Sequence, residues 1–197
     1  MFTTKINLLI ALLFITLYGQ AQNAAAKRTF AVHVGFGSEN NIGNPGPFAG
    51  ISYGKTYGDK LTAELSATYF NGSVQQMYDN AEEKYTSVFL SPRVGFNLEG
   101  TNTSAFRLQL SGGPALKWYH SKELAGNSGY TGPDGTSFLR EPVNYSSEQG
   151  LVLSVFGGLD FSFRLGKQTQ LALFIDTYSR EILLEHLMPG LKFTRQF

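Results

Sequence analysis

The sequence predicts an all-β protein, an eight-stranded antiparallel up-and-down transmembrane β-barrel, on three observations. Apolar residues alternate with polar or small residues through eight segments, which is the period of a strand whose two faces meet different surroundings. The connections between these segments are short and long in turn. Glycine and aromatic residues are abundant, with 22 Gly, 16 Phe and 10 Tyr among 197 residues, which suits curved, turn-rich β-structure.

The start of the chain predicts a secretory signal peptide over residues 1–21. Lys5 supplies the positive charge, an uncharged apolar run follows it, and small residues precede the expected cleavage point after Ala21. The apolar run is shorter than the roughly 20 residues that a membrane-spanning helix needs. We expect a short lead over residues 22–27 and a barrel domain over residues 28–197.

Eight predicted strands follow, and the clearest places Leu61, Leu65 and Tyr69 on one face. The expected strands cover residues 30–37, 47–57, 61–70, 87–96, 106–118, 151–164, 170–176 and 187–197. Tight polar turns are expected at 58–60, 99–104 and 165–167, and long loops at 38–46, 71–84 and 120–148. Short turns at one rim and long loops at the other are typical of bacterial outer-membrane barrels.

Proline positions test this reading, because proline cannot donate to a strand ladder. Pro47 and Pro189 are expected at the beginnings of strands, where the lost donor is tolerated. Pro92 and Pro114 lie inside strands on the apolar face. We predict a bulge or a bend at each of these two positions.

Alternation alone does not tell whether the apolar face points into a soluble barrel or out into lipid. The chain ends on alternating Leu191, Phe193 and Phe197, and the polar face is crowded with glycine, alanine and serine, as in the filled interior of a narrow barrel. Aromatic residues of the apolar face gather near both expected rims, as interfacial girdles do. We therefore expect an outer-membrane barrel with both termini on the periplasmic side.

Charged residues on the polar face are expected to pair inside the barrel. A hairpin register that places residue 71 near 85, 119 near 149 and 181 near 187 predicts the pairs Glu64 with Arg93, Arg107 with Asp160, and Asp176 with Lys192. An unpaired charge in the interior would cost several kcal/mol. Since eight strands leave room only for side chains, we expect a closed, salt-bridged lumen.

The composition excludes several other classes of protein. Lys and Arg total 16 against 15 Asp and Glu, a net charge of +1, so no basic arm for nucleic acid is expected. The chain has no cysteine, which excludes a disulfide scaffold and a cysteine-ligated zinc site. No three histidine or carboxylate residues fall at metal-ligand spacing, so we expect neither a metal nor a cofactor.

The signal, the eight alternating strands and the terminal aromatic together resemble the PorT-like and OmpA-like families of small outer-membrane β-barrel proteins, over roughly residues 28–197. The resemblance implies the outer membrane of a Gram-negative cell. It also implies an assembly machinery that reads a C-terminal aromatic, and so an assembly signal at Phe193 and Phe197. Because these families hold anchors, adhesins, secretion components and a few lipid-modifying enzymes, the activity stays open.

One group of residues raises the alternative of catalysis. His120, Ser121 and Glu123 lie where the fifth strand enters the longest loop, and an enzyme that resembles a lipid A deacylase would use a histidine, a serine and an acid near that rim. His120 and Ser121 are adjacent and must face opposite sides of a strand, which counts against the site. We expect His33 to pack inside the lumen and His186 to lie in a solvated turn.

The expected function is therefore a structural or interaction role without catalysis. Outer-membrane lipid is one expected partner, and the loops 71–84 and 120–148 are expected to contact an extracellular or envelope protein, because loops carry function on rigid scaffolds. Two alternatives stay open. The first is an outer-membrane lipid-modifying hydrolase, and the second is a secreted soluble lipocalin-like barrel that binds an apolar ligand.

Overall fold

The computed structural model describes most of the chain. It covers residues 26–39, 44–58, 60–75, 82–98, 106–125, 129–133, 135–139, 142–180 and 183–197. The expected signal peptide lies outside the described residues, as does most of the expected lead. Within the described ranges, no helix is long and apolar enough to cross a bilayer.

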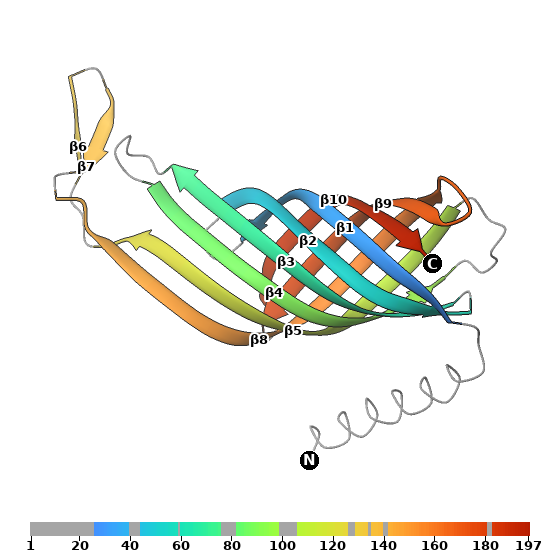
Figure 1. The fold of residues 1–197 in the computed structure, drawn as a ribbon. Helices are drawn as coiled ribbons and strands as arrows, with labels where there is room; N and C mark the ends of the chain where they lie inside the picture. The colour runs from blue at the N-terminus through green and yellow to red at the C-terminus, as the bar shows by residue number, and fades with distance from the viewer. Residues whose placement is uncertain are drawn as a thin grey trace, which may run out of the picture.

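Eight antiparallel strands close into a barrel, which confirms the predicted fold class (Figure 1). They are β1 (Ala26–Glu39), β2 (Asn44–Tyr57), β3 (Leu61–Gln75), β4 (Glu82–Asn97), β5 (Phe106–Leu124), β8 (Tyr145–Arg164), β9 (Thr169–Arg180) and β10 (Leu183–Gln196). The barrel closes where β1 pairs with β10, so that no strand is left as a free edge along the seam. The start of β1 and the end of β10 lie at the same end of the barrel (Figure 1).

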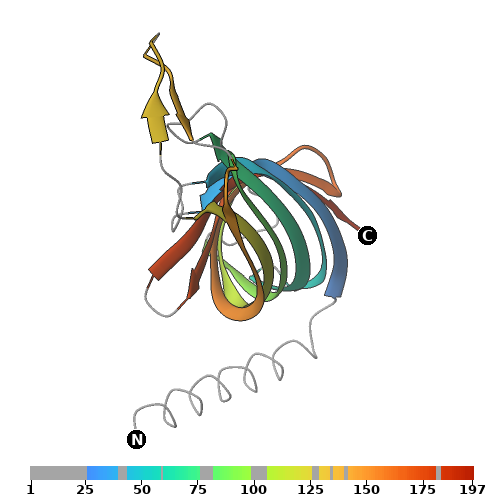
Figure 2. The same cartoon turned by 90° about the vertical axis from the view of Figure 1, so that its left-hand side faces the viewer.

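A small hairpin outside the barrel wall was not expected. It consists of β6 (Gly129–Thr131) and β7 (Ser137–Leu139), and it projects beyond the end opposite the C-terminus (Figures 1 and 2). The rings of Tyr130 and Phe138 stack across it, with centroids 5.8 Å apart. Gly135 has a φ of 85°, a left-handed conformation that glycine adopts without strain.

The strands reach further into the long connections than predicted. β3 extends to Gln75 and β4 begins at Glu82, so much of the expected loop 71–84 is strand. Likewise, β5 extends to Leu124 and β8 begins at Tyr145, at the two ends of the expected loop 120–148. The pairing continues there although the residues are mostly polar, because backbone hydrogen bonds hold a hairpin together whatever its side chains.

Burial alternates along the strands and shows which face is outside. In β4, inward residues such as Phe89 and Ser91 are buried, whereas outward Val88 and Leu90 are exposed. Exposed Val, Leu, Ile and Phe side chains recur on every strand of the barrel. The outer surface is therefore apolar, and the lumen holds the polar and charged residues together with an aromatic cluster.

Three of the prolines lie where neighbouring strands lose their pairing. Pro92 of β4 lies opposite Pro114 of β5, and the ladder between these strands lapses over residues 91–93 and 113–115 without a change of register. The structure thus has an interruption there and not a bulge. Pro189 lies inside β10, where pairing with β1 also lapses, and not at the start of a strand as expected, because β10 begins at Leu183.

Candidate functional site

Five charged side chains from five strands meet inside the barrel, and we call them the ion-pair layer. Arg93 Nη1 lies 3.0 Å from Asp176 Oδ2 and 3.9 Å from Glu64 Oε1. Lys192 Nζ lies 2.8 Å from Asp160 Oδ2 and 3.4 Å from Glu64 Oε1. Each of the two bases therefore bridges two acids, and the exposed fraction of every one of these side chains is 10% or less.

The pairing agrees with the prediction in one case and differs in two. Glu64 faces Arg93 directly across β3 and β4, as predicted. Asp160 faces Gln109 instead of Arg107 across β5 and β8, and its ion pair is with Lys192. The error is a small shift of register, since Arg107 faces Ser162.

The predicted pair of Asp176 with Lys192 is wrong for a larger reason. Asp176 faces Met188 and forms its ion pair with Arg93 from across the lumen. The chain turns between Arg180 and Leu183, earlier than expected, so the register of the last hairpin is displaced. Five of the six predicted residues still meet in the ion-pair layer, but their partners come from distant strands as well as from neighbours.

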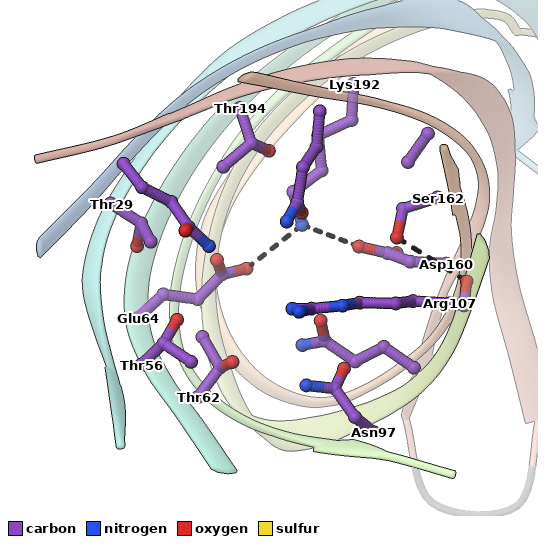
Figure 3. Close-up of a pocket in the computed structure, with 14 residues that line it drawn as sticks. Thr29, Thr56, Thr62, Glu64, Asn97, Arg107, Asp160, Ser162, Lys192 and Thr194 are labelled. Carbon is purple, nitrogen blue, oxygen red and sulfur yellow. Dashed lines mark hydrogen bonds and ion pairs between the residues drawn. The ribbon is translucent and has the colours of Figure 1, made fainter. Parts of the chain in front are cut away.

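Side chains below the ion-pair layer close the short-turn end of the lumen. A cavity of only about 40 Å³ remains there, and Thr29, Thr62, Asn97 and Arg107 are among its lining residues. Figure 3 shows these side chains pointing inward from all around the wall, with Lys192 between Glu64 and Asp160. With Arg107, three bases face three acids in this part of the barrel.

An aromatic layer fills the lumen above the ion-pair layer, on the side of the long connections. Its members are Phe48, Phe70, Tyr85, Phe89, Phe156, Phe174 and Tyr178. Phe89 and Tyr178 stack with centroids 4.0 Å apart. Arg93 joins the two layers, because its guanidinium lies 3.8 Å from the centre of the Phe156 ring and donates a 2.9 Å hydrogen bond to the Tyr178 hydroxyl.

Two histidines belong to the aromatic layer. His33 Nε2 lies 2.9 Å from Thr68 Oγ1, and the His33 ring meets Phe174 edge to face, so His33 is packed inside as predicted. His186 was expected in a solvated turn, and this prediction is wrong. Its ring is fully buried, 5.0 Å from the ring of Phe89.

A β-bulge explains the position of His186. The register of β10 against β9 shifts between Leu184 and His186. As a result, the adjacent residues Glu185 and His186 are both buried, which a regular strand does not allow. Glu185 then accepts a 2.7 Å hydrogen bond from Lys117 Nζ. The sequence marks this pair only by the two adjacent polar residues between Leu184 and Leu187, where the alternation shifts by one residue.

Above the aromatic layer, the lumen opens into a polar cup of about 340 Å³. Its lining includes Glu39, Tyr85, Lys117, Glu148 and Glu185. Tyr119 also lines it and donates a 2.6 Å hydrogen bond to Glu148 Oε1. The lumen is thus open at this end and filled below it.

The structure does not bring the three candidate catalytic residues together on one face. Ser121 and Glu123 line the polar cup, whereas His120 does not. Ser121 is buried and His120, its neighbour in β5, faces the other side of the strand. Among the described residues, no group of three His, Asp or Glu side chains is placed to hold a metal ion.

The outer surface carries the aromatic residues predicted for it. Tyr69 and Trp118 are about half exposed and lie on one line across the strands, with Val88 between them. Near the other rim, the rings of Phe106, Phe161 and Phe163 form a cluster. Phe193 and Phe197 are exposed on the last strand and the residue after it.

This combination of an apolar outer face, a filled polar lumen and a ring of eight strands defines the fold of a small outer-membrane β-barrel. Solved structures of that class are similar to this chain. A major outer membrane protein from Thermus thermophilus has a TM-score of 0.56 at 14% identity, covering 88% of this chain and 100% of that one. Neisserial surface protein A has a TM-score of 0.54 at 12% identity, covering 87% of this chain and 96% of that one.

Comparisons at the level of sequence give no such likeness. No family model matches this chain, and no curated protein matches it. The similarity is therefore one of fold, and the specific PorT-like family is not identified by it.

Proposed function

We propose that this protein is an outer-membrane β-barrel with a structural or interaction role and no enzymatic activity. One observation carries the proposal: an apolar outer face surrounds a lumen in which five charged side chains form ion pairs. A soluble lipocalin-like barrel has the opposite arrangement, with a ligand cavity among apolar side chains inside. Lipid is the medium in which an apolar outer face is stable.

The orientation follows from the two unlike ends of the barrel. The start of β1 and the end of β10 lie at the short-turn rim, so we place both termini in the periplasm. The polar cup and the β6–β7 hairpin then face outside and are available to an extracellular or envelope partner. Phe193 and Phe197, exposed on the closing strand, are our candidates for the signal that the assembly machinery reads.

Fractionation of cells tests the proposed location. We expect the protein in the detergent-extracted outer membrane, with an apparent mass on gels that changes on heating, because folded barrels resist unfolding in mild detergent. Native protein that stays dissolved and monodisperse without any amphiphile would contradict the membrane placement.

A lipid-turnover assay tests the absence of catalysis. The folded protein in micelles is given lipid A or phospholipid, and we expect no product, because His120 and Ser121 face opposite sides of β5. Product that disappears in His120→Ala, while folding is unchanged, would support the hydrolase instead. Gln149→Ala is a matched control, since Gln149 faces His120 across β5 and β8.

A further inference from the structure

A hollow of about 500 Å³ interrupts the outer apolar surface where β3, β4 and β5 run side by side. Its lining includes Tyr53, Leu65, Pro92, Val94, Gly112 and Pro114. Leu65 and Tyr53 are half exposed and belong to the apolar outer face. The hollow is therefore part of the surface that we place in lipid.

The hollow lies over the lapse in the ladder between β4 and β5. Pro92 and Pro114 face each other there, and neither has an amide hydrogen to donate. In an antiparallel pair, two opposite residues exchange both of their hydrogen bonds at every second position. Two facing prolines thus remove both hydrogen bonds of one residue pair, which we call a rung of the ladder. Its loss accounts for the lapse at the positions on either side.

Of the two glycines that precede Pro114, Gly112 makes the gap deeper. Gly112 faces outward and has no side chain to fill the space, and a Cβ there would meet only the carbonyl oxygen of Phe156, at 3.6 Å. Gly113 differs, because a Cβ there would collide with the carbonyl oxygen of Pro92. The hollow thus has open space at Gly112, and side chains can be added there without moving the backbone.

We propose that this hollow binds one acyl chain of a membrane lipid. The proposal rests on the membrane placement above and adds a specific site to it. The hollow is continuous with the apolar outer face, so hydrocarbon is the material that reaches it. Glu64 and Arg93 also line it, but their charges are paired with each other and with lumen residues, which leaves no charged group to hold a lipid headgroup.

An acyl chain also fits the energetics of the gap. An apolar hollow that stays empty forfeits dispersion contacts on one side of its lining. A flexible chain follows an irregular wall and recovers those contacts. We expect one chain to be held more firmly than the chains around the rest of the barrel.

Tryptophan fluorescence gives a direct test, because the sequence has a single tryptophan. In a Trp118→Phe background, Tyr53→Trp places a reporter at the hollow. Leu173→Trp places a control on β9, on the opposite side of the barrel and half exposed. Brominated phosphatidylcholine, which quenches tryptophan on contact, is titrated into the folded protein in detergent micelles.

We expect saturable quenching of the reporter at about one lipid per protein and only gradual quenching of the control. Gly112→Leu and Ala63→Leu fill the hollow and should weaken the apparent affinity at the reporter at least tenfold. Ala49→Leu adds the same bulk to the outer face away from the hollow, and it should leave the affinity unchanged. Heat-dependent gel mobility checks that each variant is folded.

Three results would overturn the site. The first is equal, gradual quenching at both positions, and the second is saturable quenching that the filling variants do not change. The third is a reporter shielded from brominated lipid in a chain that forms dimers, since the hollow would then be covered by a second copy. The membrane placement has its own test in vesicles that contain the brominated lipid. The tryptophan introduced at position 173 on β9 must be quenched there, and an unquenched control would contradict both the membrane placement and the acyl-chain site.

Discussion

Lys192 shows how a single charged residue can be stable in the middle of the barrel. Its ammonium group lies between Asp160 and Glu64, and only a tenth of the side chain is exposed. A buried charge without a partner is strongly unfavourable, so the three groups depend on one another. Arg93 has the corresponding role between Glu64 and Asp176.

Replacing Lys192 should therefore be costly. Lys192→Met leaves Asp160 and Glu64 without their shared base, and we expect a loss of about 3–5 kcal/mol in the free energy of unfolding. Urea unfolding of the barrel in lipid vesicles measures it. Lys84→Met is the control: its partner Glu82 is exposed, and surface pairs are worth about 0–1 kcal/mol. Equal effects of the two changes would contradict the ion-pair layer.

Gly113 and Gly112 give a second contrast between neighbouring residues. Gly113→Ala should destabilise the barrel by about 1–3 kcal/mol, because the new Cβ meets the carbonyl oxygen of Pro92. Gly112→Ala has open space and should change the stability far less. The same unfolding assay compares them, and a Gly113→Ala barrel as stable as the Gly112→Ala barrel would show that the strands do not approach so closely.

Two departures from regular strand pairing in the barrel each have a local cause. Between β4 and β5 the cause is the facing pair Pro92 and Pro114. In β10 it is the bulge before His186, which turns Glu185 and His186 to the same side. The facing prolines leave a gap in the outer face, and the bulge adds a pair of buried side chains to the lumen. A regular strand would do neither.

The missing rung between β4 and β5 can be restored. In the double variant Pro92→Ala with Pro114→Ala, each new amide faces the carbonyl of the other strand, and we expect the ladder to become continuous. Hydrogen exchange followed by NMR should then show protected amides at residues 92 and 114 and slower exchange at their neighbours. Pro133→Ala, in the turn between β6 and β7, is the control. Rapid exchange at residues 92 and 114 would mean that the prolines are not the cause of the gap.

At the scale of the whole molecule, the lumen is filled at three levels: by the side chains at the short-turn end, by the ion-pair layer and by the aromatic layer. In a planar bilayer, we expect no sustained current from the native protein. Lys192→Ala or Phe89→Ala thins one layer only and should leave the current at baseline. Large native conductance that is unchanged by the charge substitution would contradict a filled lumen.

The whole-molecule features are also the ones that the sequence predicts best. Alternation of apolar and polar residues, as in Leu61 to Tyr69, separates the two faces of each strand, and eight such segments predict the barrel. The partners in each ion pair are harder to predict from the sequence, because Arg93 and Asp176 meet across the lumen from strands that are not neighbours. The turn Gly132-Pro133-Asp134-Gly135 is a hairpin signal that could have revealed β6 and β7. The bulge before His186 is marked only by the adjacent polar residues Glu185 and His186, which are equally typical of the turn expected there.

The position of Lys192 on the last strand also bears on how the ring is completed. Until β10 docks against β1, Glu64 and Asp160 face each other across an unfinished interior without their shared cation. Docking in a register shifted by one residue would turn Lys192 to the lipid, so that Asp160 would lose its ion pair and Glu64 would keep only Arg93. The ion pairs of Lys192 with Asp160 and Glu64 therefore form only when β10 pairs with β1 in the correct register.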